Sequence, residues 1–159
     1  MAFEKRMSES FTISEGCGRS SRSISVGKFY YLGNRGEIFK EVEGGQDSRD
    51  FPILTGLTRD EIEQDPPRAR EIFHQALTLL ANYNTEMASQ NLGLSEIHYD
   101  KAAGFSLYPE KERFRVLVGF DPFEAKLKRF CQALPKLKKM NQSFAAIDLN
   151  YEGRVILTL

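Results

Sequence analysis

Histidines and clustered carboxylates are the residue types in this sequence best suited to general acid–base catalysis. The two histidines are His74, in a run with helical periodicity, and His98, in a run typical of a strand. No candidate catalytic triad stands out around either of them. We therefore expect both to be surface or structural side chains.

Asp60, Glu61 and Glu63 form the densest group of carboxylates, but their position favours a structural interpretation. They follow Thr58, and the Thr58/Glu61 spacing is that of a capping box at a helix N-terminus. Acidic side chains in a first helical turn also interact favourably with the helix dipole. The group is explained without any chemistry.

Metal and phosphate chemistry have little support in the sequence. Cys17 and Cys131 match no CxxC or mixed Cys/His ligand pattern, and they fit one disulfide or two free thiols equally well. Nucleotide-binding, zinc-protease and serine-hydrolase motifs do not occur, and Gly33 and Gly36 are placed as turn glycines. We expect no catalytic residue, metal site or cofactor, and a binding or scaffold domain is favoured over an enzyme.

The surrounding elements are strands joined by short turns, interrupted by helices. Helices are expected from Arg59, over residues 67–87 and over residues 121–140. Strands are expected at 28–33, 37–42, 94–99, 104–108, 113–119, 145–150 and 154–159. Since most of these strands are joined as hairpins, the sequence predicts an α+β fold, with an antiparallel β-sheet and two main amphipathic helices on one face.

Each long helix has one apolar stripe and defined ends. The stripes consist of Ala69, Ile72, Phe73, Ala76, Leu79, Leu80, Tyr83 and Met87 in the first helix and Phe123, Leu127, Phe130, Leu134 and Leu137 in the second. Asp65 is placed to cap the first helix, and Gly93 should end it in the left-handed conformation. Asp121 and Glu124 should form a capping box on the second, and Pro135 should kink or break it.

The domain organisation follows from a change in composition near residue 25. Residues 1–25 are rich in Ser, Gly and Arg, and we expect them to be mostly disordered or atypical, with residues 11–14 as their one strand-like piece. Residues 26–159 carry the periodic patterns and should form the folded domain. The chain has no apolar run long enough for a transmembrane helix and no signal peptide pattern.

The charge is unevenly distributed although its formal sum is zero at pH 7. Residues 51–100 are mainly acidic and residues 101–159 mainly basic. Much of the basic charge lies on the helix 121–140, at Lys126, Lys128, Arg129, Lys136, Lys138 and Lys139. A solvated helix face explains this pattern best, and a small nucleic-acid-binding domain that uses this helix is the alternative.

The C-terminal residues 143–159 read as a hairpin that ends without polar cover. Ala145, Ile147 and Leu149 alternate with polar or small residues, Glu152 and Gly153 suggest a turn, and residues 154–159 form the last strand. If no strand follows, the last one exposes unpaired backbone groups or serves as a docking site. An interior strand that fills the core is the competing interpretation.

Short motifs in this order resemble a bacterial cell-division family. FPILTG at 51–56 and IDLNY at 147–151 resemble the extracytoplasmic β domain of FtsQ, called DivIB in Gram-positive bacteria, and GEIF at 36–39 and VLVG at 116–119 extend the similarity over about residues 28–159. Gly33 stands where an aspartate is usual, Asn150 where an arginine is usual, and EGCGR at 15–19 replaces the E-R-x-P entry to the domain. The family's transmembrane helix and most of its POTRA domain are missing.

This resemblance implies a non-enzymatic divisome scaffold on the extracytoplasmic, periplasmic side of the inner membrane. Such a scaffold binds FtsB/FtsL (DivIC)-type partners along its last strand and helps control septal peptidoglycan synthesis. The implied partner-binding residues are Tyr151, Glu152, Arg154, Val155, Ile156 and Leu157. The resemblance implies no cofactor and no nucleic acid, and membrane attachment only through a transmembrane segment absent from this chain. An enzyme would instead require a deep pocket lined by His74 or His98 and a carboxylate.

Overall fold

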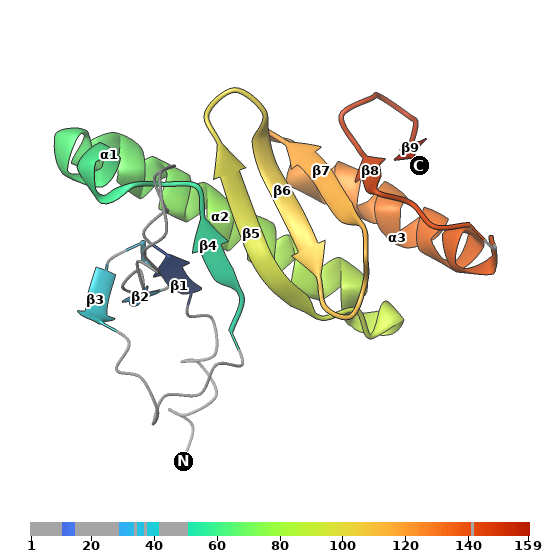
Figure 1. The fold of residues 1–159 in the computed structure, drawn as a ribbon, viewed down its shortest axis with the longest axis horizontal. Coiled ribbons are helices and arrows are strands. Elements are labelled where there is room, and N and C mark those ends of the chain that lie inside the picture. Colours follow the sequence, from blue (N-terminus) through green and yellow to red (C-terminus); the bar gives the residue numbers. More distant parts are fainter. Residues whose placement is uncertain (1–10, 15–28, 34, 37, 42–50, 141) are drawn as a thin grey trace, which may run out of the picture. The chain divides into compact units, whose positions relative to one another are not determined.

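The computed structural model describes residues 11–14, 29–33, 35–36, 38–41, 51–140 and 142–159 (Figure 1). The chain divides into two compact units, Met1–Leu77 and Thr78–Leu159. Apart from residues 11–14, the expected N-terminal segment 1–25 lies outside the described residues, and its assignment as a separate region stays a prediction.

The first unit contains four short strands, the whole of one short helix and the start of a second helix. The strands are β1 (Phe11–Ser14), β2 (Phe29–Leu32), β3 (Ile38–Glu41) and β4 (Ile53–Thr55), and they lie in the order β3-β2-β1-β4. β1 pairs antiparallel with β2 and parallel with β4. The strand-like piece expected at residues 11–14 is therefore a strand, and it lies between two partners.

The capping box predicted for α1 (Arg59–Gln64) is confirmed. The Glu61 backbone N–H donates to Thr58 Oγ1 at 3.3 Å, and the Thr58 backbone N–H donates to Glu61 Oε2 at 2.9 Å. Glu63 is held by Arg59 at 2.6 Å on the exposed side of the same helix. The acidic group is thus part of a helix start, as its spacing predicted.

α2 (Pro66–Met87) is the longest helix, and its stripe is buried as expected. Asp65 Oδ1 accepts from the Arg68 backbone N–H at 3.1 Å, which is the predicted N-terminal cap. In the first unit Ile72 and Phe73 are each 3% exposed, and in the second unit Tyr83 is 1% exposed. The predicted stop at Gly93 was wrong, because α2 runs into the 3₁₀ helix η2 (Ala88–Gln90) and Asn91 takes the left-handed conformation, with a φ of 50°.

The second unit is built on five strands in the order β5-β6-β7-β8-β9. These are β5 (Leu94–Asp100), β6 (Gly104–Pro109), β7 (Arg115–Gly119), β8 (Ala146–Asp148) and β9 (Ile156–Thr158). β5/β6, β6/β7 and β8/β9 are antiparallel, as predicted. β7/β8 is parallel, because the chain between these strands crosses over through α3 (Phe123–Lys139) instead of turning back in a hairpin.

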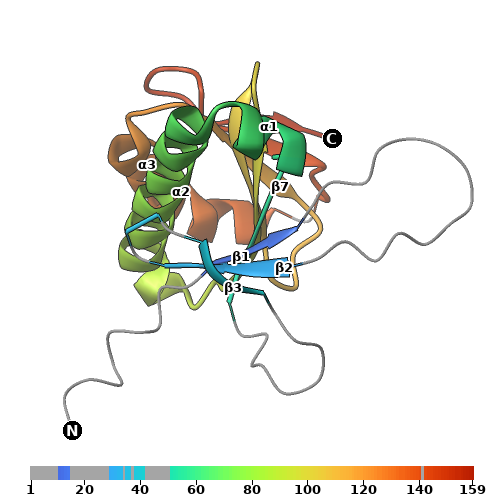
Figure 2. The same cartoon turned by 90° about the vertical axis from the view of Figure 1, so that its left-hand side faces the viewer.

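The core of the second unit lies between its strands and its helices. Figures 1 and 2 show α3 and the Thr78–Met87 part of α2 on the same face of β5–β7, which agrees with the α+β expectation. Phe105 is fully buried at the centre, with its ring 5.2 Å from that of Tyr99 and 5.7 Å from that of Phe123. The fold is a mixed α/β structure with a sheet and covering helices.

For α3, the expected capping box was wrong, and Pro135 does not break the helix. The N-cap is Pro122, which makes no side-chain capping hydrogen bond, so Asp121 and Glu124 do not form a capping box. α3 also continues past Pro135 to Lys139. Proline removes only one backbone donor, and the buried side chain of Leu134 and the half-buried side chain of Leu137 hold the helix on both sides of the exposed Pro135.

Candidate partner-binding edge

The C-terminal strand β9 occupies one end of the strand order in the second unit. It pairs with β8 in a register that sets Ile147 opposite Leu157 and Asp148 opposite Ile156 (Figure 1). Among the strands that the structure describes, β8 is its one partner. The other side of β9 therefore presents a short row of backbone donors and acceptors that a further strand could pair with.

The six predicted partner-binding residues lie together on this terminal hairpin. Tyr151, Glu152 and Arg154 lie in the loop, Val155 just before β9, and Ile156 and Leu157 within it. Tyr151 is 56% exposed and Ile156 is 39% exposed, whereas Leu157 is half-buried. The strand expected over residues 154–159 is shorter, at Ile156–Thr158, and the turn lies at Glu152 and Gly153 as expected.

A turn begins at Tyr151 in the loop between β8 and β9. The Arg154 backbone N–H donates to the Tyr151 carbonyl at 3.2 Å, and Gly153 has a φ of +67°, a conformation that favours glycine. Nothing lies within 4 Å of the position that a Cβ on Gly153 would take. The turn is thus formed by backbone conformation rather than by packing, and it leaves the tyrosine ring outside the core.

Lys126 of α3 holds the residues that precede this loop. Its Nζ donates to the carbonyls of Val118 at 2.7 Å and Phe120 at 2.6 Å, and to Asn150 Oδ1 at 3.3 Å. Desolvation lowers the pKa of Lys126, with a further lowering by Arg129, while Asp121 and Asp148 oppose the shift. One ammonium group therefore joins the end of β7 to the start of the β8–β9 loop.

Arg129 and Asp148 complete this link. Arg129 Nη2 donates to the Leu149 carbonyl at 2.9 Å, and the Leu149 backbone N–H donates to the Leu117 carbonyl at 2.9 Å. Asp148 Oδ1 accepts from both the backbone N–H and the side-chain amide of Asn150, at 2.8 Å and 2.9 Å. The residue immediately before Tyr151 is thus fixed by contacts with α3 and β8.

Gly119 makes room for this arrangement. Its φ is +71°, and a Cβ added there would overlap Asn150 Oδ1. Any larger residue would displace the Asn150 side chain and disturb its contacts with Lys126 and Asp148. The "VLVG" pattern of the sequence therefore has a direct structural role next to the loop.

The sequence interpretation missed the part played by Lys126 and Arg129. Both were assigned to a solvated helix face, but both are partly buried and donate to backbone carbonyls. Their spacing contained a usable signal, since they flank the buried Leu127 on the side of α3 that faces the sheet. Lys128, Lys136, Lys138 and Lys139 are exposed, as expected for that face.

The histidines and Cys131 do not form part of this edge. His74 is exposed, with its ring 3.2 Å from the position that a Cβ on Gly36 would take, and the half-exposed His98 lies with Nδ1 4.0 Å from Glu96 Oε1. Cys131 is a free thiol that donates to the Glu86 carbonyl at 3.1 Å, and Cys17 lies outside the described residues. The Cys131 contact joins α3 to the C-terminal part of α2.

Within the described residues, His, Cys, Asp and Glu side chains do not gather in groups of three that could hold a metal ion. None of the helices described has the length and apolar character needed to cross a membrane.

The fold and the exposed edge define a mixed α/β domain with unpaired backbone groups along one side of its last strand. The sequence model of the cell division protein FtsQ/DivIB C-terminal domain matches residues 23–150. The chain therefore belongs to the FtsQ/DivIB family of cell-division proteins. It is 34% identical over 149 residues to cell division protein FtsQ of Geobacter sp. (strain M21), a match that covers 93% of this chain and 53% of that protein.

Two further relatives give the same result. Cell division protein FtsQ of Geotalea daltonii is 30% identical over 134 residues, or 84% of this chain and 48% of the relative. The corresponding protein of Syntrophotalea carbinolica is 30% identical over 130 residues, or 82% of this chain and 46% of the relative. The chain thus spans about half the length of the curated relatives it matches.

Proposed function

We propose that this chain is a non-enzymatic divisome scaffold that binds an FtsB/FtsL (DivIC)-type subunit by adding a strand to β9. The observation that carries the proposal is the end position of β9 in the strand order, with β8 as its one partner among the described strands. A peptide in extended conformation can satisfy the outer backbone groups of such a strand, and side-chain pockets beside it then give selectivity. The partner contributes a strand, or a strand followed by a helix.

Tyr151 is the proposed aromatic anchor beside the added strand. It is 56% exposed although aromatic residues are usually more buried, and tyrosine is among the residue types most often found at binding hot spots. The hydrogen bonds of Lys126 to Asn150 and of Arg129 to Leu149 hold the chain that leads into Tyr151. A backbone segment that is already held loses less conformational entropy on binding, which favours affinity.

Family membership supports the compartment and the process in which this binding takes place. We place the domain on the extracytoplasmic, periplasmic side of the inner membrane, where it helps control septal peptidoglycan synthesis through the partner it holds. The relatives named above are cell-division proteins, and this chain spans about half of their length.

Two proline variants test the proposal together. Consecutive residues of a strand direct their N–H groups to opposite sides, so Ile156→Pro and Leu157→Pro each remove a donor from a different side of β9. The variant that loses the outward donor should keep the wild-type unfolding midpoint and lose the FtsB-type subunit in a pull-down. The variant that loses the donor facing β8 should be destabilised.

Tyr151→Ala is the matched side-chain control, since it leaves the backbone donors in place. It should lower the amount of FtsB-type subunit retained in the pull-down without abolishing strand addition. If both proline variants fold and still retain the partner at wild-type levels, the docking site lies elsewhere.

A nucleic-acid-binding function for α3 is the second candidate. Its support is the row of exposed cations Lys128, Lys136, Lys138 and Lys139, but Lys126 and Arg129 are used within the fold. Retention on DNA or RNA that falls steeply with salt would favour this candidate over strand addition.

A further inference from the structure

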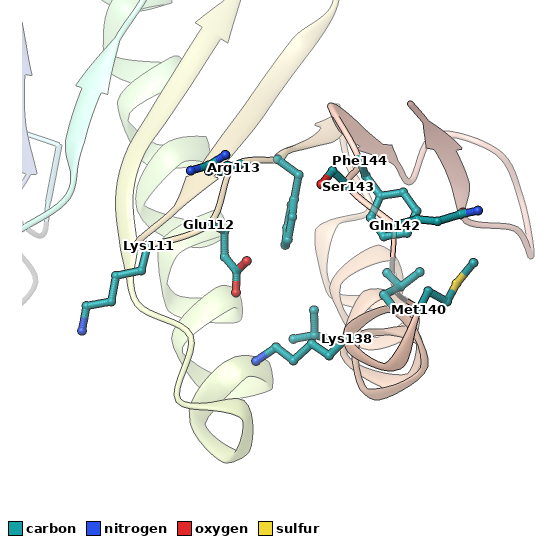
Figure 3. Close-up of a pocket in the computed structure, with 11 residues that line it drawn as sticks. Lys111, Glu112, Arg113, Lys138, Met140, Gln142, Ser143 and Phe144 are labelled. Carbon is teal, nitrogen blue, oxygen red and sulfur yellow. The ribbon is translucent and has the colours of Figure 1, made fainter.

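A second surface feature of the C-terminal unit lies away from the outer side of β9. It is a pocket of about 390 Å³ between the β6–β7 turn and the end of α3, shown in Figure 3. Its lining residues are Lys111, Glu112, Arg113, Phe114, Leu134, Leu137, Lys138, Met140, Gln142, Ser143 and Phe144. The volume falls at the lower end of the range of about 300–1,000 Å³ that is usual for ligand pockets.

The walls of this pocket combine an apolar lining with a cationic rim. Leu134 and Phe144 are buried, Phe114 and Leu137 are half-buried, and Met140 is 44% exposed. Lys111, Arg113 and Lys138 are exposed, and Glu112 is the one carboxylate among the lining residues. The site therefore offers contact area to an apolar side chain and positive charge around it.

Lys138 extends toward the opening of the pocket, and Lys111 and Arg113 extend outward from the turn beside it (Figure 3). Within the described part of the chain, no ion pair involves Lys111, Arg113 or Lys138. In Figure 3 the side chains of Glu112 and Lys138 extend toward each other across the opening, one from the turn and one from α3. An incoming carboxylate could pair with Lys138, which forms no ion pair among the described residues.

We propose that this pocket binds an acidic segment of a partner protein, with one large apolar side chain inserted between Met140 and Phe114 and carboxylates beside the rim cations. A small-molecule site gathers a few fixed polar groups around an enclosed centre, whereas here the polar groups are long and lie at the edge. Complementary charge at a rim mainly directs and selects partners, and the apolar contact supplies most of the affinity. This binding is independent of strand addition at β9.

The test uses two short fluorescent peptides and the full chain. One peptide has a Phe flanked by Glu residues, and its twin has Lys in place of every Glu. The acidic peptide should bind with saturation, and its affinity should fall as salt increases, since rim charges are screened. The amides it perturbs in nuclear magnetic resonance spectra should include those of Glu112, Lys138 and Ser143.

Charge variants then identify the site. Arg113→Glu and Lys138→Glu should each weaken binding of the acidic peptide by about fivefold to tenfold, and Glu112→Gln should strengthen it by about twofold. Lys128→Glu, on an exposed part of α3 outside the pocket, should leave the affinity unchanged and is the matched control.

Three results would overturn the proposal: no saturable binding of the acidic peptide, equal binding of the basic twin, or an effect of Lys128→Glu as large as that of Lys138→Glu. None of these variants alters β9, so all of them should still retain the FtsB-type subunit in a pull-down. The peptide measurements therefore test the pocket alone, and the pull-down tests strand addition at β9 alone.

Discussion

At the scale of single residues, the loop that presents Tyr151 depends on polar contacts made by its neighbours. Asn150 is held by Asp148 and Lys126, and Gly119 leaves the space that its side chain needs. The exposed tyrosine itself contributes little to this order. The residues that position the loop therefore differ from the residue proposed to bind the partner, so substitutions can test the two roles separately.

Lys126→Met should destabilise the domain and loosen the loop. It removes the donor of two short hydrogen bonds to carbonyls of the β7 end, and we expect a loss of about 1–3 kcal/mol in the free energy of unfolding. Urea denaturation measures this loss. The control is Lys128→Met on the exposed side of α3, which should stay within about 0.5 kcal/mol of wild type. Equal stability of the two variants would show that the Lys126 bonds contribute nothing.

Tyr83 should make the stability of the domain fall at alkaline pH. Burial raises the pKa of its hydroxyl strongly, with smaller contributions from Glu110 and Glu112. The unfolded chain therefore releases this proton near pH 10 while the folded chain keeps it, so the free energy of unfolding declines as pH rises above about 10. Tyr83→Phe should flatten this part of the stability profile. An unchanged alkaline slope in that variant would contradict the assignment.

At the scale of elements, the apolar stripe of α2 is predicted by the sequence and is buried in the structure. Phe73→Ala should cost about 3–5 kcal/mol of unfolding free energy, because the ring is 3% exposed and its removal leaves a cavity. Thermal or urea unfolding measures the effect, with the exposed Thr78→Ala in the same helix as control. A midpoint unchanged by the Phe73 substitution would refute the packing of this stripe.

Elements whose ends follow local rules were predictable from the sequence. The Thr58/Glu61 capping box, the Asp65 cap and the stripe of α2 depend on neighbours in the chain, and all three are present. Local rules failed where contacts with distant parts of the chain determine whether a helix ends or continues. Leu134 and Leu137 keep α3 helical through Pro135, and Asn91 rather than Gly93 takes the left-handed position.

The candidate edge was predictable only in part for the same reason. Alternation and the terminal turn located the hairpin, because both are short-range signals. The role of Lys126 and Arg129 depends on α3 lying beside the end of β7, a contact that joins distant parts of the sequence. The parallel pairing of β7 with β8 likewise follows from the crossover through α3, not from either strand alone.

At the scale of the whole molecule, the domain offers two different surfaces in its C-terminal unit. The β9 edge offers backbone hydrogen bonds, and the pocket at the end of α3 offers apolar contact with positive charge. An edge strand left bare is also an aggregation risk, so we expect a bound partner to improve solubility as well as function. Light scattering of the chain with and without the FtsB-type subunit checks this expectation, and unchanged self-association on saturation with the partner would contradict it.

Amide hydrogen exchange at Ile156–Thr158, measured with and without the FtsB-type subunit, tests strand addition most directly. Strand addition predicts that the outward-facing amides exchange rapidly in the free chain and become protected when the subunit is bound, while the amides of β8 keep their protection in both states. Unchanged exchange throughout β9 in a sample saturated with the subunit would contradict strand addition.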